Sequence, residues 1–330
     1  MDLAEPAEPA EPAEPFEPAE AAGALEPFEP VGAATSVAAP RRAPEAPAEE
    51  VRHRRVLSSL WHSRRGRAGC ILTGIVVLTS VAAWLGQFPY SPLLQNPTAS
   101  LKAPSAAHLF GTDQFGRDMV AQVMQGLSVS LEIAVVAVLI AGTIGTLGGI
   151  VAGYFGRWTS AVTMRFTDML FAIPAILLAL AIVTALGAGW FHSALAIGIG
   201  YIPIFVRVVR GPVLSLRESP FIRAGRVLGL SRRRLLFRHI LPNVSGVVAV
   251  QVSLALAWSI LAEATLSFLG LGPPPPTASL GLMVYNATAL AATAWWTLAF
   301  PSVAIIVAVV GFNFLGDGLR DATDPRARTR

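Results

Sequence analysis

The chain has 330 residues, of which 53% are hydrophobic and only 14% are charged, and its mean hydropathy is +0.57. A soluble domain of this size needs more charge to cover its surface, so the composition excludes an ordinary soluble protein and indicates a lipid-exposed one. Charge is also unevenly distributed. Residues 1–50 hold twelve acidic residues against two Arg, whereas the rest of the chain holds 23 basic and nine acidic residues.

Lys, Cys and His are too few or too scattered for several kinds of active site. The only Lys, Lys102, follows Leu101, whereas a phosphate-binding P-loop needs Gly-Lys followed by Ser or Thr. The only Cys, Cys70, has no partner for an internal disulfide, and the five His lack metal-ligand spacing. We therefore expect no catalytic residue, no metal and no cofactor, so any ATP that drives the protein must bind to another subunit.

Residues 1–50 form an acidic tail in which Glu-Pro-Ala or Glu-Pro-Phe recurs between positions 4 and 30. Pro blocks regular hydrogen bonding and the Glu residues repel each other, so we expect this cytoplasmic tail to be disordered. It lacks the apolar stretch of a secretory signal. An unselected low-complexity extension is the favoured interpretation, with docking through Phe16 and Phe28 as the alternative. A basic juxtamembrane segment with six Arg follows over residues 51–68.

Six apolar runs come next, each close to the ~20 residues that cross ~30 Å of hydrocarbon. They should be helices, because backbone polar groups in lipid must be satisfied within the segment or in a closed barrel. A barrel is disfavoured because the runs are apolar on every side and do not alternate. The sequence thus predicts an all-α polytopic membrane protein whose six transmembrane helices cover residues 69–88, 133–155, 168–186, 193–213, 244–269 and 297–315.

Basic residues predict the orientation of these helices. One side of the predicted spans carries 21 Arg, against Lys102 and Arg117 on the other. The positive-inside rule then places both termini in the cytoplasm, in agreement with an even number of spans. Residues 89–126 become an extracytoplasmic segment, and residues 127–320 form a core with five spans and a cytoplasmic loop at 214–243. Residues 321–330 form a cytoplasmic tail.

The second span carries small residues at every fourth position, a spacing that lets another helix approach closely. This stripe predicts helix packing, either static or as a surface that slides during transport, and the two alternatives are equally compatible with the sequence. Its members are Ala141, Gly145, Gly149 and Gly153. Pro174, Pro203 and Pro301 each permit a kink in a span, which is a weak signal for a cavity.

The cytoplasmic loop before the fifth span predicts a short capped helix. Ser219 is a good N-cap, Pro220 suits the first helical position, and Gly229 can end the helix in a left-handed conformation. Such a short helix is not stable alone in water, so it needs something to pack against. The membrane surface, the protein's own helices and a partner protein are all candidates.

Five segments, taken in order along the chain, resemble the motifs of one protein family. The loop reads Ala224-Gly225-x-x-x-Gly229 and then His239-Ile-Leu-Pro242, and the other segments are HLFGTDQFGRD (108–118), AGY with MRFTD (152–154 and 164–168), EATLSFLGLG (263–272) and GDGLRDATDP (316–325). Together they resemble the inner-membrane permeases of binding-protein-dependent ABC importers for dipeptides, oligopeptides and nickel, specifically the second, "C"-type permease. Arg223 and Gly225 in the loop, and Leu280 where a Trp is common, depart from the family pattern.

The resemblance implies a type I ABC-importer permease fold in the bacterial plasma membrane. It also implies four partners: a second homologous permease subunit, one or two ATPase subunits, an extracytoplasmic solute-binding protein and the lipid bilayer. No nucleic acid is expected. The loop helix becomes the coupling helix that fits into the ATPase, with Phe221 as its apolar anchor. The implied coupling residues are Glu218, Pro220, Phe221, Arg223, Ala224, Gly225, Arg226, Leu228 and Gly229, with His239, Leu241 and Pro242 ending the loop.

Acidic residues near the spans are candidates for function because ionisable groups are costly in lipid. Glu132 and Glu263 are weak candidates for lining a translocation cavity, and for Glu263 a structural role is favoured. We expect Asp168 to pair with Arg165, three residues before it on the same helix face.

The leading hypothesis for function is a non-enzymatic permease subunit that translocates peptides or similar small solutes, driven by separate ATPase subunits. Nickel in place of peptide is one alternative. An ion-coupled secondary transporter using Glu132, Glu263 or Asp168 is another, although the sequence lacks clear inverted repeats. A scaffold that recruits proteins through its acidic tail is the third. The sequence does not identify the solute.

Overall fold

The computed structural model describes residues 60, 61 and 63–323. Within these residues all regular secondary structure is helical, apart from one isolated β-bridge between Thr112 and Asp118. The all-α prediction is therefore confirmed. The predictions for the acidic tail at 1–50, for most of the basic segment at 51–68 and for the end of the tail at 321–330 lie outside the described residues.

Five described helices are long and apolar enough to cross a membrane, and a broken pair of shorter helices raises the number to six. The long helices are α2 (Arg64–Trp84), α3 (Met119–Phe155), α6 (Trp190–Arg217), α9 (Leu241–Phe268) and α11 (Trp295–Thr323). The broken pair is α4 (Arg157–Phe171) with α5 (Ala175–Leu186). The order of the apolar runs along the chain matches the six-span prediction.

The predicted span at 168–186 is not continuous. α4 ends at Phe171 and α5 starts at Ala175, and the two helices meet at an angle of 82°. Pro174 explains the break, because it has no N–H to donate and disfavours helical geometry in the residue before it. The expected kink is therefore a sharp bend between two separate helices, and Asp168 lies near the end of α4 rather than at the start of a span.

The second predicted span is longer than expected. α3 begins at Met119 rather than at residue 133, because the Asp118 side chain accepts a hydrogen bond from the N–H of Ala121 and caps the helix. α3 is consequently 37 residues long and extends beyond the ~20 residues that a bilayer requires. Its two ends therefore lie in or beyond the interfacial regions of a membrane.

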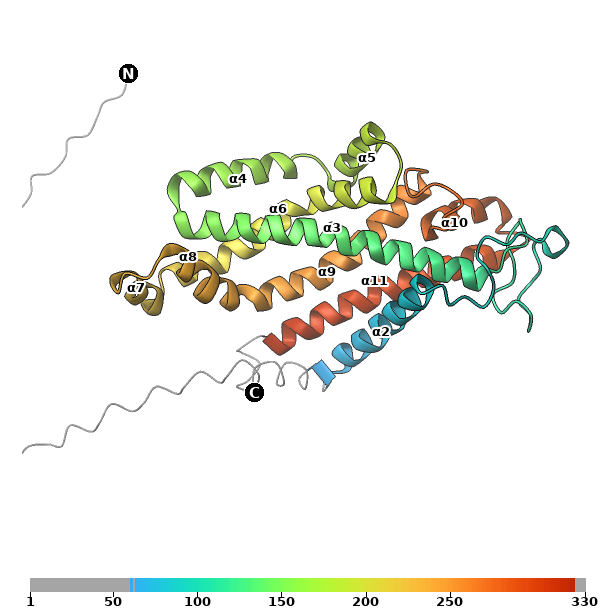
Figure 1. The fold of residues 1–330 in the computed structure, drawn as a ribbon, viewed down its shortest axis with the longest axis horizontal. Helices are drawn as coiled ribbons and strands as arrows, with labels where there is room; N and C mark the ends of the chain where they lie inside the picture. Colours follow the sequence, from blue (N-terminus) through green and yellow to red (C-terminus); the bar gives the residue numbers. More distant parts are fainter. Residues whose placement is uncertain (1–59, 62, 324–330) are drawn as a thin grey trace, which may run out of the picture. The chain divides into compact units, whose positions relative to one another are not determined.

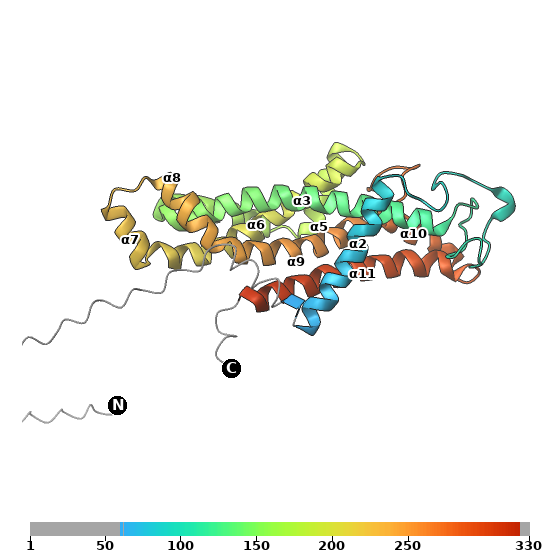
Figure 2. The same ribbon diagram turned by 60° about the horizontal axis from the view of Figure 1, so that its bottom comes forward.

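Close helix packing organises the bundle. α3 lies along α6, and α11 lies between α2 and α9 (Figures 1 and 2). A side chain added at Gly69 of α2 would collide with the backbone of α11 at Leu315, and one at Gly311 would crowd Leu72. Glycines therefore bring α2 and α11 together as closely as they do α3 and α6.

The two ends of the bundle carry different structures. At one end lie α7 (Pro220–Val227), α8 (Arg232–Leu235) and the π-helical turn η2 (Leu236–Ile240) (Figure 1). At the other lie the long loop between α2 and α3, which includes the short helix η1 (Pro97–Ala99), and α10 (Leu280–Ala287) with η3 (Thr288–Leu290) (Figure 2). We refer to these as the α7 end and the loop end.

Candidate functional site

The predicted loop helix forms as α7, and its end has the geometry that Gly229 favours. Pro220 occupies the first turn, Leu228 is the C-cap, and Gly229 follows with φ of +73°. Positive φ costs Gly little but strains other residues, which explains Gly at this position. The side chain of Ser219 does not cap the helix. Its Oγ donates to the carbonyl of Leu216 instead, at 2.5 Å.

α7 has one face inside the protein and another that is open. Ile222 is fully buried in a cluster with Val209, Val213 and Leu235, which attaches α7 to α6 and α8. Gly225 is also buried, because Leu230 and Leu235 lie close enough to contact a side chain added there. The residue that anchors α7 within the chain is therefore Ile222, which the sequence analysis did not single out; the anchor role predicted for Phe221 concerns the ATPase partner.

The open face of α7 is apolar, and we call it the α7 tip: Phe221, Val227 and Leu228. These side chains are 48%, 88% and 80% exposed, respectively. Large apolar side chains grouped on a short helix outside the apolar spans indicate a surface for a partner. Ala224, also exposed, lies on the same helix. Val227 was missed by sequence reasoning, although its place beside Leu228 at the end of the helix was a usable signal.

Arg side chains fold back from this loop onto the C-terminal end of α3. The guanidinium of Arg226 lies 5.0 Å from the ring centre of Tyr154, and that of Arg232 lies 5.9 Å from the ring centre of Phe155. Arg223 Nε donates to the carbonyl of Glu218 at 2.9 Å. A cavity of about 410 Å³ separates α7 and α8 from the end of α3. The loop is thus attached to α3 by cation–π contacts as well as by apolar packing.

The end of the loop joins α9 through a wider helical turn. η2 carries His239 and leads into Leu241 and Pro242, the first residues of α9, and the N–H of Leu241 bonds to the carbonyl of Leu236. Pro242 cannot donate a backbone hydrogen bond, so a local rearrangement of the helix here has an identifiable cause. Asn243 restores one contact by donating to the carbonyl of His239 at 2.5 Å.

The stripe of small residues in α3 packs against α6. Ala141 is fully buried in a cluster with Phe205, and a side chain at Gly149 would come within 2.8 Å of the carbonyl of Val206. Gly145 and Gly153 face Phe205 and Val213 in the same way. The stripe thus lies in the most extensive helix contact of the bundle, and whether it slides stays a prediction.

The partner predicted for Asp168 is wrong. Glu263, in contrast, has the surroundings of a residue with a structural role, which is the role favoured for it. It is fully buried between α3 and α9, where Ser130 and Ser267 donate to its carboxylate at 2.5 and 2.6 Å. Asp168 accepts from Arg207 of α6 at 2.9 Å rather than pairing with Arg165, because α6 lies alongside α4. The remaining candidate, Glu132, is exposed.

A second cavity lies within the bundle, among α5, α6 and α9. It measures about 270 Å³, and its walls are mostly apolar, with Ala179 and Ile197 at the back. Tyr201, Trp258 and Thr265 bring the polar groups to this wall. Sequence reasoning missed this cavity, because Tyr201 and Trp258 come from different spans and only the bend between α4 and α5 lets α5 close over them.

The loop end is held by a network that the 108–118 segment builds. Asp113 accepts hydrogen bonds from the backbone N–H groups of Phe115 and Arg117 and from Arg117 Nε, the last at 2.7 Å. Asp118 pairs with His108 at 2.9 Å, and Trp296 Nε1 donates to the carbonyl of Thr112 at 3.1 Å. The segment thereby ties the long loop to the starts of α3 and α11.

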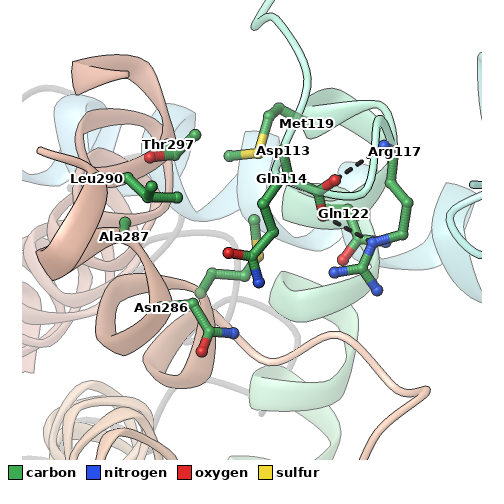
Figure 3. Close-up of a pocket in the computed structure, with 10 residues that line it drawn as sticks. Asp113, Gln114, Arg117, Met119, Gln122, Asn286, Ala287, Leu290 and Thr297 are labelled. Carbon is green, nitrogen blue, oxygen red and sulfur yellow. Dashed lines mark hydrogen bonds and ion pairs between the residues drawn. The ribbon is translucent and has the colours of Figure 1, made fainter. Parts of the chain in front are cut away.

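A small pocket lies beside this network. Asp113, Gln114, Arg117 and Gln122 line it from the loop and α3, and residues of α10 such as Asn286 line it from the facing side (Figure 3). Its volume is only about 30 Å³, so it has room for a water molecule but not for a transported solute.

Bundle, broken span and projecting loop helix together define a membrane-embedded transport subunit, and comparison with known proteins gives its family. Residues 145–329 match the family described as binding-protein-dependent transport system inner membrane component. The chain belongs to this family, as the sequence motifs predicted. It is accordingly a multi-pass inner-membrane protein and a permease subunit of an ABC importer rather than an enzyme.

Relatives cover most of the chain. It is 41% identical to the dipeptide transport system permease protein DppC of Alkalihalophilus pseudofirmus, over 78% of this chain and 84% of the relative. It is 40% identical to the probable D,D-dipeptide transport system permease protein DdpC of Escherichia coli K12, over 78% and 86%. It is 41% identical to the glutathione transport system permease protein GsiD of Pectobacterium atrosepticum, over 69% and 76%.

A solved structure shares the fold. A chain of the inward-facing MetNI methionine ABC transporter superposes with a TM-score of 0.52, at 19% identity, over 62% of this chain and 98% of that chain. The type I permease fold expected from the motifs is therefore confirmed.

Proposed function

We propose that this chain is one of two membrane-spanning subunits of a peptide importer, and that α7 couples it to a separate ATPase. Relatives named for dipeptide, D,D-dipeptide and glutathione transport support a short peptide rather than nickel as the solute. The observation that carries the coupling role is the α7 tip, an apolar surface outside the spans that residues 60, 61 and 63–323 leave uncovered.

The proposal assigns each end of the bundle to a side of the membrane. The α7 end is cytoplasmic, because the stretch from Arg207 to Arg238 holds nine Arg. The loop end then faces outward, where a binding protein delivers the solute. Both termini are cytoplasmic in this assignment.

The cavity among α5, α6 and α9 is our candidate for part of the solute path. It lies in the apolar part of the bundle, and Trp258 and Leu261 on its rim are 57% and 39% exposed. The second permease subunit would complete its open side. Tyr201, Trp258 and Thr265 offer hydrogen bonds to peptide groups, while the apolar wall accepts a side chain.

The coupling role is tested by substituting one residue of the α7 tip. The chain is purified with the second permease subunit and the ATPase subunits, reconstituted in liposomes, and supplied with binding protein loaded with single dipeptides. Leu228→Asp should reduce recovery of the ATPase with the permease and ATP hydrolysis at least about tenfold, because a carboxylate cannot be buried unpaired in an apolar groove. Leu109→Asp, at a residue 68% exposed at the loop end, is the matched control for ATPase recovery.

Coupling through α7 would be contradicted if the Leu228→Asp variant still recovered the ATPase normally and if loaded binding protein still stimulated its ATP hydrolysis. The assignment of the solute would be contradicted if ATP hydrolysis were stimulated by binding protein loaded with a nickel chelate but not by binding protein loaded with any dipeptide.

A further inference from the structure

The cavity behind the coupling helix has the composition of an anion site. Tyr154 and Phe155 from the end of α3, Arg217 from the end of α6, Arg226 from α7 and Arg232 from α8 line its 410 Å³. We propose that this Arg cavity binds a phosphate group, supplied by the headgroup of an anionic phospholipid.

Local charge favours an anion strongly. Residues 154–158 and 216–240 contain eight Arg and a single acid, Glu218. Glu218 is 63% exposed and pairs with Arg217 at 3.2 Å, so the three Arg of the cavity keep a net charge of about +2. The three Arg come from separate helices to one cavity, so an anion bound between them would reduce their mutual repulsion.

Donor geometry points the same way. Arg226 and Arg232 lie over aromatic rings, at 5.0 and 5.9 Å from the ring centres, and a guanidinium that stacks on a ring can still donate from the N–H groups at its edge. In the part of the chain that the structure describes, Arg226 makes only a long contact of 3.4 Å to the carbonyl of Arg217, and Arg232 makes no side-chain hydrogen bond. Guanidinium forks held in this way match phosphate oxygens.

The position of the cavity favours lipid over other phosphates. Phe155 ends the long helix α3 and is 40% exposed, so the cavity opens where an apolar span reaches the membrane surface. Basic residues beside a span attract the anionic lipids of the cytoplasmic leaflet. An acidic residue of the ATPase is disfavoured as the occupant, because Arg226 and Arg232 turn back onto α3 while the partner surface is the α7 tip.

A bound headgroup would brace the coupling loop against α3. It would connect α7 and α8 to the end of α3 through the same two Arg whose ring contacts already hold the loop. Transmission of movement from the coupling helix to the bundle would then depend on the lipid composition of the membrane.

Native mass spectrometry of the full-length chain, released from nanodiscs of mixed phosphatidylglycerol and phosphatidylcholine, tests the site. The double variant Arg226→Gln/Arg232→Gln should retain about tenfold less phosphatidylglycerol than the natural chain. The control Arg233→Gln/Arg234→Gln removes the same charge from the same loop outside the cavity, and should change retention less than about twofold. Arg226→Lys/Arg232→Lys keeps the charge but not the fork, and should also lose most of the lipid.

Several results would overturn the proposal. They are equal losses in the two Gln pairs, full retention by the Lys pair, or no preference of the natural chain for phosphatidylglycerol. Displacement of the lipid by inorganic phosphate would overturn the lipid source, and lost ATPase binding with unchanged lipid retention would assign the cavity to a protein contact. Lipid retention is measured without transport, so the outcome is independent of the proposed peptide import.

Discussion

The two ends of the bundle differ in whether their polar groups are paired and their apolar side chains are buried. At the loop end, Thr112 and Asp118 are buried, and their side chains bond within the chain to the loop, to α3 and to His108. At the α7 end, Val227 and Leu228 are more than three-quarters exposed, and Arg226 and Arg232 rest on aromatic rings. Within the described residues, the loop end pairs its own polar groups, whereas the α7 end leaves large apolar side chains exposed.

This difference bears on how such a subunit works. A polar network with every member paired has a fixed geometry, which suits a docking face that keeps its shape. A short helix held by the buried Ile222 and by one cation–π contact, from Arg226 to Tyr154, can shift as a unit when its partner moves. The proposed coupling through α7 would require the α7 end to be less tightly held than the loop end, and substitutions at each end test this.

The largest expected effect comes from breaking the loop-end network. Asp113→Ala removes the acceptor of two backbone N–H groups and leaves the Arg117 guanidinium without its ion-pair partner. We expect the free energy of unfolding to fall by about 3 kcal/mol, seen as a lower unfolding temperature of the chain in detergent. Gln114→Ala, at an exposed neighbour, is the control and should change the unfolding temperature little. An unchanged unfolding temperature for Asp113→Ala would show that the network is not what holds this end.

The next effect separates the two faces of α7. Ile222→Ala should open the loop locally, because the residue is fully buried, at a cost of about 2 kcal/mol. Trypsin should then cleave at the Arg residues of the loop about thirtyfold faster in the isolated chain. Phe221→Ala, half exposed on the other face, should leave cleavage nearly unchanged and weaken ATPase binding instead. The reverse pattern would mean that Phe221, and not Ile222, attaches α7 to the rest of the chain.

The sequence predicts the framework better than the contacts, for a physical reason. Apolar length and the helix signals at Pro220 and Gly229 act within a few residues, so spans and the loop helix are recognisable from the chain alone. Asp168 illustrates the limit: its partner, Arg207, lies 39 residues away, and only the packing of α6 beside α4 brings them together. Glu263 is similar, because its partner Ser130 comes from another span.

A smaller effect concerns the exit from α7. Gly229 has φ of +73° with no atom near the place of a side chain, so Gly229→Ala meets strain in the backbone and no collision. We expect a loss of about 1 kcal/mol in local stability, observed as about fivefold faster amide exchange in α7. Gly211→Ala, within α6 and also in open space, is the control and should stabilise slightly or have no effect. Equal behaviour of the two variants would mean that the turn after α7 relaxes freely.

The smallest effect is expected at Ser219, and it opposes a rule of helix capping. Replacing an N-cap Ser with Ala ordinarily costs about 1 kcal/mol, because a helix N–H loses its acceptor. Here the Ser219 hydroxyl donates backwards to Leu216, so α7 has no side-chain bond at this cap to lose. Ser219→Ala should therefore change amide exchange in α7 less than about twofold, whereas Asp118→Ala should destabilise the start of α3 clearly. A large effect of Ser219→Ala would mean that the hydroxyl turns to cap α7 when the protein is embedded in a membrane. The α7 end would then be held by its own polar side chains, as the loop end is.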